Sequence, residues 1–220
     1  RSISPEGAAS PSPKCDLVSP TSYPPTHVDG YHGWISATPC VTVCLVTMVA
    51  EQAHRDGEVG VQFAKQFLES TTHIELPFNV YDNMPQTTFV RLDGEKKRYD
   101  LAGHFLGKNR RPVAVENKAY TVVGKQPQDY SEFLANAYSI TARECESGVD
   151  TEREYMWLTT YPFAQNKWLK LRSPEEIADA LIAHKEALNG RVIDNALLQR
   201  VAQRLWLIPL HDRQRELVLE

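Results

Sequence analysis

Apolar residues recur at helical spacing in the segment that follows residue 57. Val59, Phe63 and Phe67 fall on one side of a helical wheel, whereas charged and amide side chains fall on the other sides. This pattern predicts an amphipathic helix over about residues 58–69. The preceding segment, residues 38–55, is apolar almost all round, so it fits either a buried helix or a buried strand.

Farther along the chain the pattern becomes that of extended strands. Four segments are rich in β-branched and apolar residues and are expected to be strands, namely residues 87–92, 97–106, 113–120 and 155–161. Asp93-Gly94 between the first two is a strong hairpin signal, and the polar run at 107–112 predicts another turn. Helical spacing returns at about residues 128–143. The expected order is therefore a helix, three strands, a helix and a fourth strand.

The two ends of the chain have patterns of their own. Ser173-Pro-Glu-Glu176 has the form of a capping box at the start of a helix, and Asp194 can cap a second helix. The N-terminal residues are rich in proline and serine and show little periodicity. We therefore expect an α/β protein with a mixed sheet flanked by helices. Its expected parts are an irregular arm at 1–37, a core at 38–165 and a C-terminal helical extension packed on the core at 166–220.

Composition narrows the class of protein. The 220-residue chain is 42% hydrophobic and 24% charged, as in globular proteins, and its net charge of −4 argues against a protein held to nucleic acid by charge everywhere. The longest strongly apolar run, residues 40–50, is shorter than the roughly 20 residues that cross a bilayer, so no membrane partner is expected. The first residues lack the apolar core of a secretory signal, and four cysteines are too few for a disulfide scaffold. A cytoplasmic location is expected, with a secreted toxin left open.

Two carboxylates and a lysine stand on the expected strands at a spacing that suits hydrolysis assisted by a metal ion. Asp100 lies on the second strand and Glu116 on the third, and Lys118 is two residues beyond Glu116. Because residues two apart on a strand face the same side, Glu116 and Lys118 should project together toward Asp100. A divalent cation held by carboxylates can activate water and neutralise a phosphate, and a lysine can add positive charge.

The surroundings of these residues decide between a site and a plain charged strand end, which the spacing alone also fits. Residues 113–115 form an uncharged apolar run that is typical of a central, buried strand. In the window 91–125, nine lysines and arginines stand against four aspartates and glutamates, within a chain of net charge −4. This local basic excess beside paired carboxylates suits a polyanionic substrate.

These residues resemble the signature of a known nuclease superfamily. The string YDLAGH with Asp100, followed by VAVENK with Glu116 and Lys118, is similar to the D…(D/E)xK signature of the PD-(D/E)xK, or restriction-endonuclease-like, superfamily. Gln126 and Tyr130 resemble the QxxxY element of its exonuclease-type and CRISPR-associated branches. The resemblance covers about residues 55–163 and implies the αβββαβ core of that superfamily.

The resemblance also implies a metal centre. Asp100 and Glu116 would bind Mg²⁺ or Mn²⁺, and a backbone carbonyl near Asn117 would complete the protein ligands. Many members use a further glutamate from the first helix. Glu58 at the start of that helix is the candidate, and Glu69, on nearly the same face, is left open.

Catalysis and substrate binding are expected from residues around this centre. The resemblance implies a catalytic role for Lys118 and substrate positioning by Gln126 and Tyr130. The basic window adds further candidates for substrate binding, which are Lys97, Arg98, Arg110 and Arg111.

The expected function is hydrolysis of phosphodiester bonds in nucleic acid, with DNA preferred over RNA, by an endo- or exodeoxyribonuclease. A bacterial defence or restriction system is the favoured context, and the assembly is expected to be a homodimer or a larger defence complex. One alternative is a catalytically inactive module of the same fold that binds nucleic acid or serves protein assembly. A second alternative is a protein-interaction domain whose charged strand ends are incidental.

Overall fold

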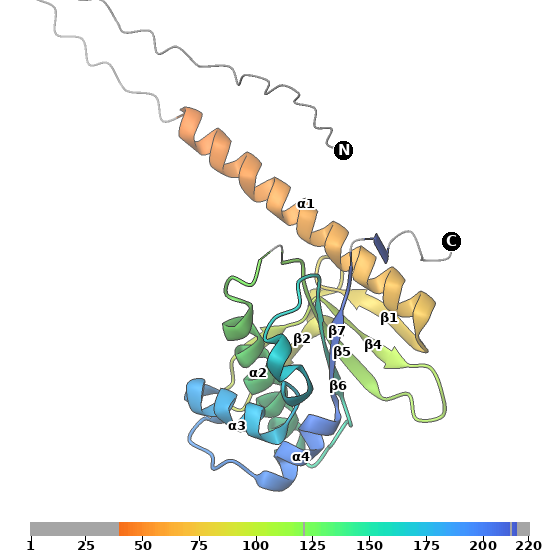
Figure 1. The fold of residues 1–220 in the computed structure, drawn as a ribbon, viewed down its shortest axis with the longest axis vertical. Coiled ribbons are helices and arrows are strands. Elements are labelled where there is room, and N and C mark those ends of the chain that lie inside the picture. The colour runs from red at the N-terminus through yellow and green to blue at the C-terminus, as the bar shows by residue number, and fades with distance from the viewer. Residues whose placement is uncertain (1–39, 121, 212, 215–220) are drawn as a thin grey trace, which may run out of the picture. The chain divides into compact units, whose positions relative to one another are not determined.

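A mixed sheet of five strands forms the centre of the protein (Figure 1). The computed structural model describes residues 40–120, 122–211 and 213–214, and within residues 40–54 it describes only the side chain of Gln52. The strand order is β1-β4-β5-β6-β7, in which β1, β4 and β5 are antiparallel neighbours and β5, β6 and β7 run parallel. The strands are β1 (Ile74–Asn79), β4 (Leu101–Phe105), β5 (Pro112–Lys118), β6 (Glu154–Thr159) and β7 (Leu205–Pro209).

Helices cover both faces of this sheet (Figure 1). Alternate residues of β5 face opposite sides, so that Val113 and Val115 pack with helix α1, whereas Ala114 packs with helix α2. The helices are α1 (Cys40–Thr71), α2 (Gln126–Glu146), α3 (Pro174–Ala183) and α4 (Asn195–Gln203), and the 3₁₀ turns are η1 (Met84–Thr87), η2 (Gln165–Lys170) and η3 (Lys185–Leu188). Both layers of apolar side chains therefore meet at β5, which is buried on both faces as its apolar run predicted.

Much of the predicted order is confirmed. The helix expected at 58–69 is the C-terminal part of α1, which is continuous from Cys40, so the strand alternative for the segment before it is wrong. The hairpin at Asp93-Gly94 joins β2 (Thr88–Val90) to β3 (Lys96–Arg98) in a separate two-stranded sheet. Helix α2 and strands β5 and β6 lie where the periodicity placed them.

The strand predicted at 97–106 is broken in two at Tyr99 and Asp100. The Tyr99 N–H donates to Thr87 O, directly before β2 of the hairpin sheet, whereas the Asp100 N–H donates to Val115 O of the main sheet. The chain therefore changes sheets between these two residues, with Tyr99 buried against α2. A continuous pattern of extended residues could not reveal this break, because both halves are extended.

Strands β1 and β7 were not predicted, and the C-terminal segment is therefore not wholly helical. Leu205, within the segment 166–220 that was expected to be helical, begins β7, which pairs in parallel with β6 and completes the main sheet. The two helix starts in this segment are confirmed. Ser173 Oγ accepts a hydrogen bond from the Glu176 N–H at 3.3 Å, and Asp194 Oδ1 accepts one from the Ala196 N–H at 2.8 Å.

Two further expectations concern the N-terminal arm and the possibility of a membrane-spanning helix. The arm predicted at 1–37 lies outside the described residues. Among the helices that the structure describes, none is both long enough and apolar enough to cross a bilayer.

Candidate functional site

Asp100, Glu116 and Lys118 come together where β4 begins and β5 ends. Because β4 and β5 are antiparallel, the residue before β4 lies beside the last residues of β5. Asp100 is fixed there twice: its N–H donates to Val115 O at 3.0 Å, and its Oδ2 accepts from the Asn117 N–H at 2.7 Å. The change of sheet at this point thus places the Asp100 carboxylate directly against the Glu-x-Lys segment.

Glu116 is a buried carboxylate held between two lysines. Its side chain is only 7% exposed, and Lys118 Nζ lies 2.9 Å from its Oε1. Lys97 Nζ, from the hairpin sheet, lies 3.2 Å from Oε1 and 3.1 Å from Oε2. Glu116 Oε2 is buried and accepts no hydrogen bond, so the Lys97 contact with this atom is an ion pair without hydrogen-bond geometry. Burying a carboxylate is costly unless it is paired, and here two ammonium groups meet that need.

The pKa of the Asp100 carboxyl is raised by its surroundings. Burial and the neighbouring Glu116 carboxylate raise the pKa of Asp100 to about 6, against the opposing effects of the Asn117 N–H, Lys118 and Lys97. For Lys118, burial lowers the pKa, but Glu116 and Asp100 outweigh it, and the net pKa lies above the ordinary lysine value. Lys118 is therefore an ammonium group at neutral pH, suited to stabilising negative charge and unsuited to accepting a proton.

Of the two candidate glutamates on α1, Glu58 lies near Tyr81, a neighbour of Asp100, whereas Glu69 does not. Tyr81, just after β1, has a pKa raised by burial, by Asp100 and by Glu58, which places both carboxylates near one phenol. The Tyr81 hydroxyl would lie 2.6 Å from a Cβ at Gly57, so the helix passes close to it. Glu69 is engaged elsewhere, since its Oε1 accepts from the Leu76 N–H of the edge strand β1 at 2.8 Å.

The four basic residues expected to bind substrate divide between the two ends of β5. Lys97 is at the site, and on the adjacent position of β3 the Arg98 guanidinium donates to Met84 Sδ at 3.6 Å. Arg110 and Arg111 precede β5 at its other end. About five residues of strand separate Arg111 from Glu116, or roughly 17 Å. The structure therefore does not bring Arg110 and Arg111 to the carboxylates, because the strand between them is fully extended.

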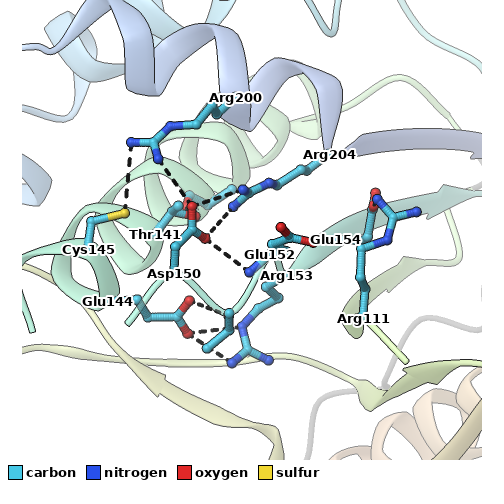
Figure 2. A network of polar contacts seen from close by, with 12 residues as sticks. Arg111, Thr141, Glu144, Cys145, Asp150, Glu152, Arg153, Glu154, Arg200 and Arg204 are labelled. Atoms are coloured by element: carbon cyan, nitrogen blue, oxygen red, sulfur yellow. Dashed lines mark hydrogen bonds and ion pairs between the residues drawn. The ribbon is translucent and has the colours of Figure 1, made fainter. Parts of the chain in front are cut away.

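The end of the sheet that carries Arg111 has a polar network of its own. Arg111 Nη1 lies 2.5 Å from the buried carboxylate of Glu154. In the same region Asp150 lies between the guanidinium groups of Arg200 and Arg204 (Figure 2). Its carboxylate oxygens are 3.2 Å from Arg200 Nη1 and 2.7 Å from Arg204 Nη1. Each of these charged side chains therefore has a partner of opposite charge within the protein. The Asp150 contacts tie the loop before β6 to α4 and its C-terminal end, and the candidate site lies at the opposite end of the sheet.

Gln126 and Tyr130 are buried and serve packing in this structure. The Gln126 side chain donates to Tyr161 O at 2.6 Å and accepts from Thr159 Oγ1 at 3.0 Å. Both its amide nitrogen and its amide oxygen are therefore bonded to residues at or just after the end of β6. The Tyr130 hydroxyl donates to Leu171 O at 2.9 Å. Neither side chain presents a polar atom to a substrate. Their predicted substrate contact has no support in the geometry, because both side chains lie on the buried face of α2.

Sequence reasoning missed three residues around the site. Tyr81 lies between α1 and Asp100, as described. On the other side the Tyr120 hydroxyl donates to Asp129 in the first turn of α2, and Asp129 contributes to raising the pKa of Lys118. The nine-residue spacing of Tyr120 and Asp129 across a loop carries no pattern that would have identified them.

Three groups of the site could bind a divalent cation: the carboxylates of Asp100 and Glu116 and the backbone carbonyl of Asn117. Within the described part of the chain, no group of three or more His, Cys, Asp or Glu side chains is placed to hold a metal ion. Mg²⁺ commonly takes only one or two carboxylates and keeps several waters, so Asp100 and Glu116 suffice in number. The buried Oε2 of Glu116 accepts no hydrogen bond and is held only by the Lys97 ion pair, so it is a ligand atom of the right chemistry. The Asn117 N–H points toward Asp100, to which it donates a hydrogen bond. Because the carbonyl of a strand residue points to the same side as its N–H, the Asn117 carbonyl also faces the Asp100 side of β5.

No protein-family model, no curated protein and no solved structure matches this chain. The arrangement described above is therefore the observation from which a function is inferred. Two neighbouring carboxylates, one with its pKa raised, and two ammonium groups at the end of a buried strand form a centre suited to binding a cation and an anion together.

Proposed function

We propose that this chain is a metal-dependent nuclease that hydrolyses phosphodiester bonds of DNA, with Asp100, Glu116 and Lys118 as its centre. The observation that carries the proposal is the meeting of these three residues at the junction of β4 and β5, although 15 residues separate the two carboxylates in sequence. A strongly perturbed aspartate beside a paired glutamate and a lysine is typical of a functional site.

The residues have distinct roles in this proposal. Asp100 and Glu116, with the Asn117 carbonyl, would hold Mg²⁺ or Mn²⁺, and Glu58 is the further candidate from α1. The cation, when bound, supplies activation of water and neutralisation of phosphate charge. Lys118 is already an ammonium group and would donate to the phosphate oxygen on which negative charge increases.

The order of elements also supports a restriction-endonuclease-like fold. In the main sheet the chain runs α1-β1-β4-β5-α2-β6, with β6 parallel to β5, which is an αβββαβ order. The β2–β3 hairpin is then an insertion between the first two strands. This assignment uses β1 and not the segment 87–92 as the first strand. A bacterial defence or restriction role stays a prediction.

Cleavage of supercoiled plasmid and of single-stranded DNA with Mg²⁺, Mn²⁺ or EDTA tests the proposal. The wild type should cut with metal only, and Lys118→Ala should lower the rate by roughly 100-fold or more. Lys108→Ala is the matched control, because Lys108 is an exposed lysine in the turn at the far end of β5 and its loss should leave the rate unchanged. Absence of cutting with every metal, together with absence of metal binding, would refute the catalytic proposal.

One observation favours a second candidate, a catalytically inactive nucleic-acid-binding or assembly module of the same fold. Lys97 and Lys118 carry two positive charges against the carboxylates of Glu116 and Asp100, so the centre is electrically balanced without a cation. That candidate predicts DNA binding that falls as salt rises, is unaffected by EDTA and leaves the DNA intact.

A further inference from the structure

The β2–β3 hairpin inserts a second lysine into the centre, and its position is specific. Lys97 reaches Glu116 across 19 residues of sequence, at 3.2 Å from Oε1 and 3.1 Å from Oε2. Its Nζ also lies 5.5 Å from the centre of the Tyr99 ring, and its side chain is 20% exposed. Tyr99 is the residue at which the chain leaves the hairpin for the main sheet, so Lys97 is held over the site by the same break that positions Asp100.

The two lysines hold Glu116 unequally. Lys118 forms a 2.9 Å contact with Oε1 from the same strand. Lys97 shares Oε1 at a longer distance, and its contact with Oε2 has no hydrogen-bond geometry. Of the two Glu116 oxygens, Oε2 is therefore the one with the weaker partner, because Lys97 contacts it without a hydrogen bond.

A cation on Glu116 would conflict with Lys97. A divalent metal lies about 2.1 Å from its carboxylate ligands. With Lys97 Nζ only 3.1 Å from Oε2, a metal on that oxygen would stand within about 5 Å of the ammonium group. Like charges at this separation repel strongly, even when water screens them.

We propose that Lys97 is an exchangeable counter-ion of Glu116: it neutralises the carboxylate in the metal-free protein and gives way when a divalent cation binds. Lys97 then competes with the metal, so the affinity for metal is set partly by the hairpin and not only by the ligands. The inference rests on the proposed function, because it assumes that Glu116 is a metal ligand.

Titration calorimetry with Mn²⁺ on the full chain, at fixed pH and ionic strength, tests the exchange. Lys97→Met should bind Mn²⁺ roughly tenfold more tightly than the wild type, because one repelling charge is gone. Lys97→Arg should bind like the wild type, because it keeps the charge. The matched control is Lys96→Met, since Lys96 is the exposed neighbour on the same strand and its removal should leave the affinity unchanged.

Two further variants keep the test decisive. Asp100→Asn in the Lys97→Met background should abolish the gain, which assigns the binding to this centre. If Lys97→Met does not unfold cooperatively on heating, Lys97→Gln replaces it with the same expectation.

The outcomes separate the two proposals. Equal or weaker binding by Lys97→Met, with binding by the wild type intact, overturns the exchange and leaves the metal site standing. An equal gain in Lys96→Met also overturns it, because the effect would then be one of general surface charge. No Mn²⁺ binding by the wild type or any variant overturns both the exchange and the metal-dependent function.

Discussion

Replacing Asp100 with asparagine is expected to stabilise the metal-free protein at neutral pH. Burial and Glu116 raise the pKa of Asp100 from 3.8 to about 6 in the folded state. Between these values the folded protein binds more protons than the unfolded chain, so stability is fully present below about pH 4 and is lost as pH rises through 6. Asparagine retains a carbonyl oxygen that can accept the Asn117 N–H bond, and it carries no charge to bury.

The size of the effect follows from the shift. A shift of about two pKa units corresponds to about 3 kcal/mol of unfolding free energy, at about 1.4 kcal/mol for each unit. The free energy of unfolding of Asp100→Asn minus that of the wild type should therefore increase by about 3 kcal/mol between pH 4 and pH 7.5. A site that stores this much unfavourable energy is expected to be retained for a function other than stability.

Urea unfolding in EDTA at several values between pH 4 and pH 7.5 measures this difference. Asp56→Asn is the control, because Asp56 is an exposed carboxylate on α1 and its replacement should change stability by no more than about 0.5 kcal/mol at each pH. A difference between Asp100→Asn and the wild type that stays constant with pH would refute the reasoning. It would mean that the Asp100 carboxylate is not destabilised by burial beside Glu116.

Three other replacements test structural roles. Glu154→Ala should lower the free energy of unfolding by about 2 kcal/mol, because it leaves Arg111 without its buried partner; unchanged urea unfolding would contradict this. Gln126→Ala should cost about 2 kcal/mol by removing the two buried hydrogen bonds of the Gln126 amide, to Thr159 Oγ1 and Tyr161 O, while the cleavage rate per folded molecule stays the same; loss of cleavage at unchanged stability would instead make Gln126 a substrate residue. Asp194→Ala should cost about 1 kcal/mol in thermal unfolding through loss of a helix cap, and Asp194→Ser should restore most of it; equal losses in both would exclude capping as the cause.

Local patterns predicted those elements whose residues interact mainly with near neighbours in sequence. The caps at Ser173 and Asp194 are examples, since each bonds to a backbone N–H within three residues. The hairpin turn at Asp93-Gly94 is another, because Gly94 adopts the positive φ of 88° that the turn requires. Strand β7 was missed because its place depends on pairing with β6, about 50 residues away.

The same division holds at the site. Glu116 and Lys118 could be paired from sequence alone, because two residues apart on a strand means one face. The participation of Lys97 in an ion pair with Glu116, and the burial of Gln126, could not be foreseen, because each depends on a contact between segments far apart in the chain.

The sequence by itself determined the α/β class, the buried central strand β5 and the spacing of Asp100, Glu116 and Lys118, because periodicity and local turns act over a few residues. Only the tertiary structure decided that the chain changes sheets at Asp100, since that break depends on hydrogen bonds to two different sheets. The same break brings Lys97 onto Glu116, whereas the extended length of β5 separates the carboxylates from the arginines at its other end. Long-range pairing fixes which charges meet, and the charges that meet determine the chemistry that the centre can perform.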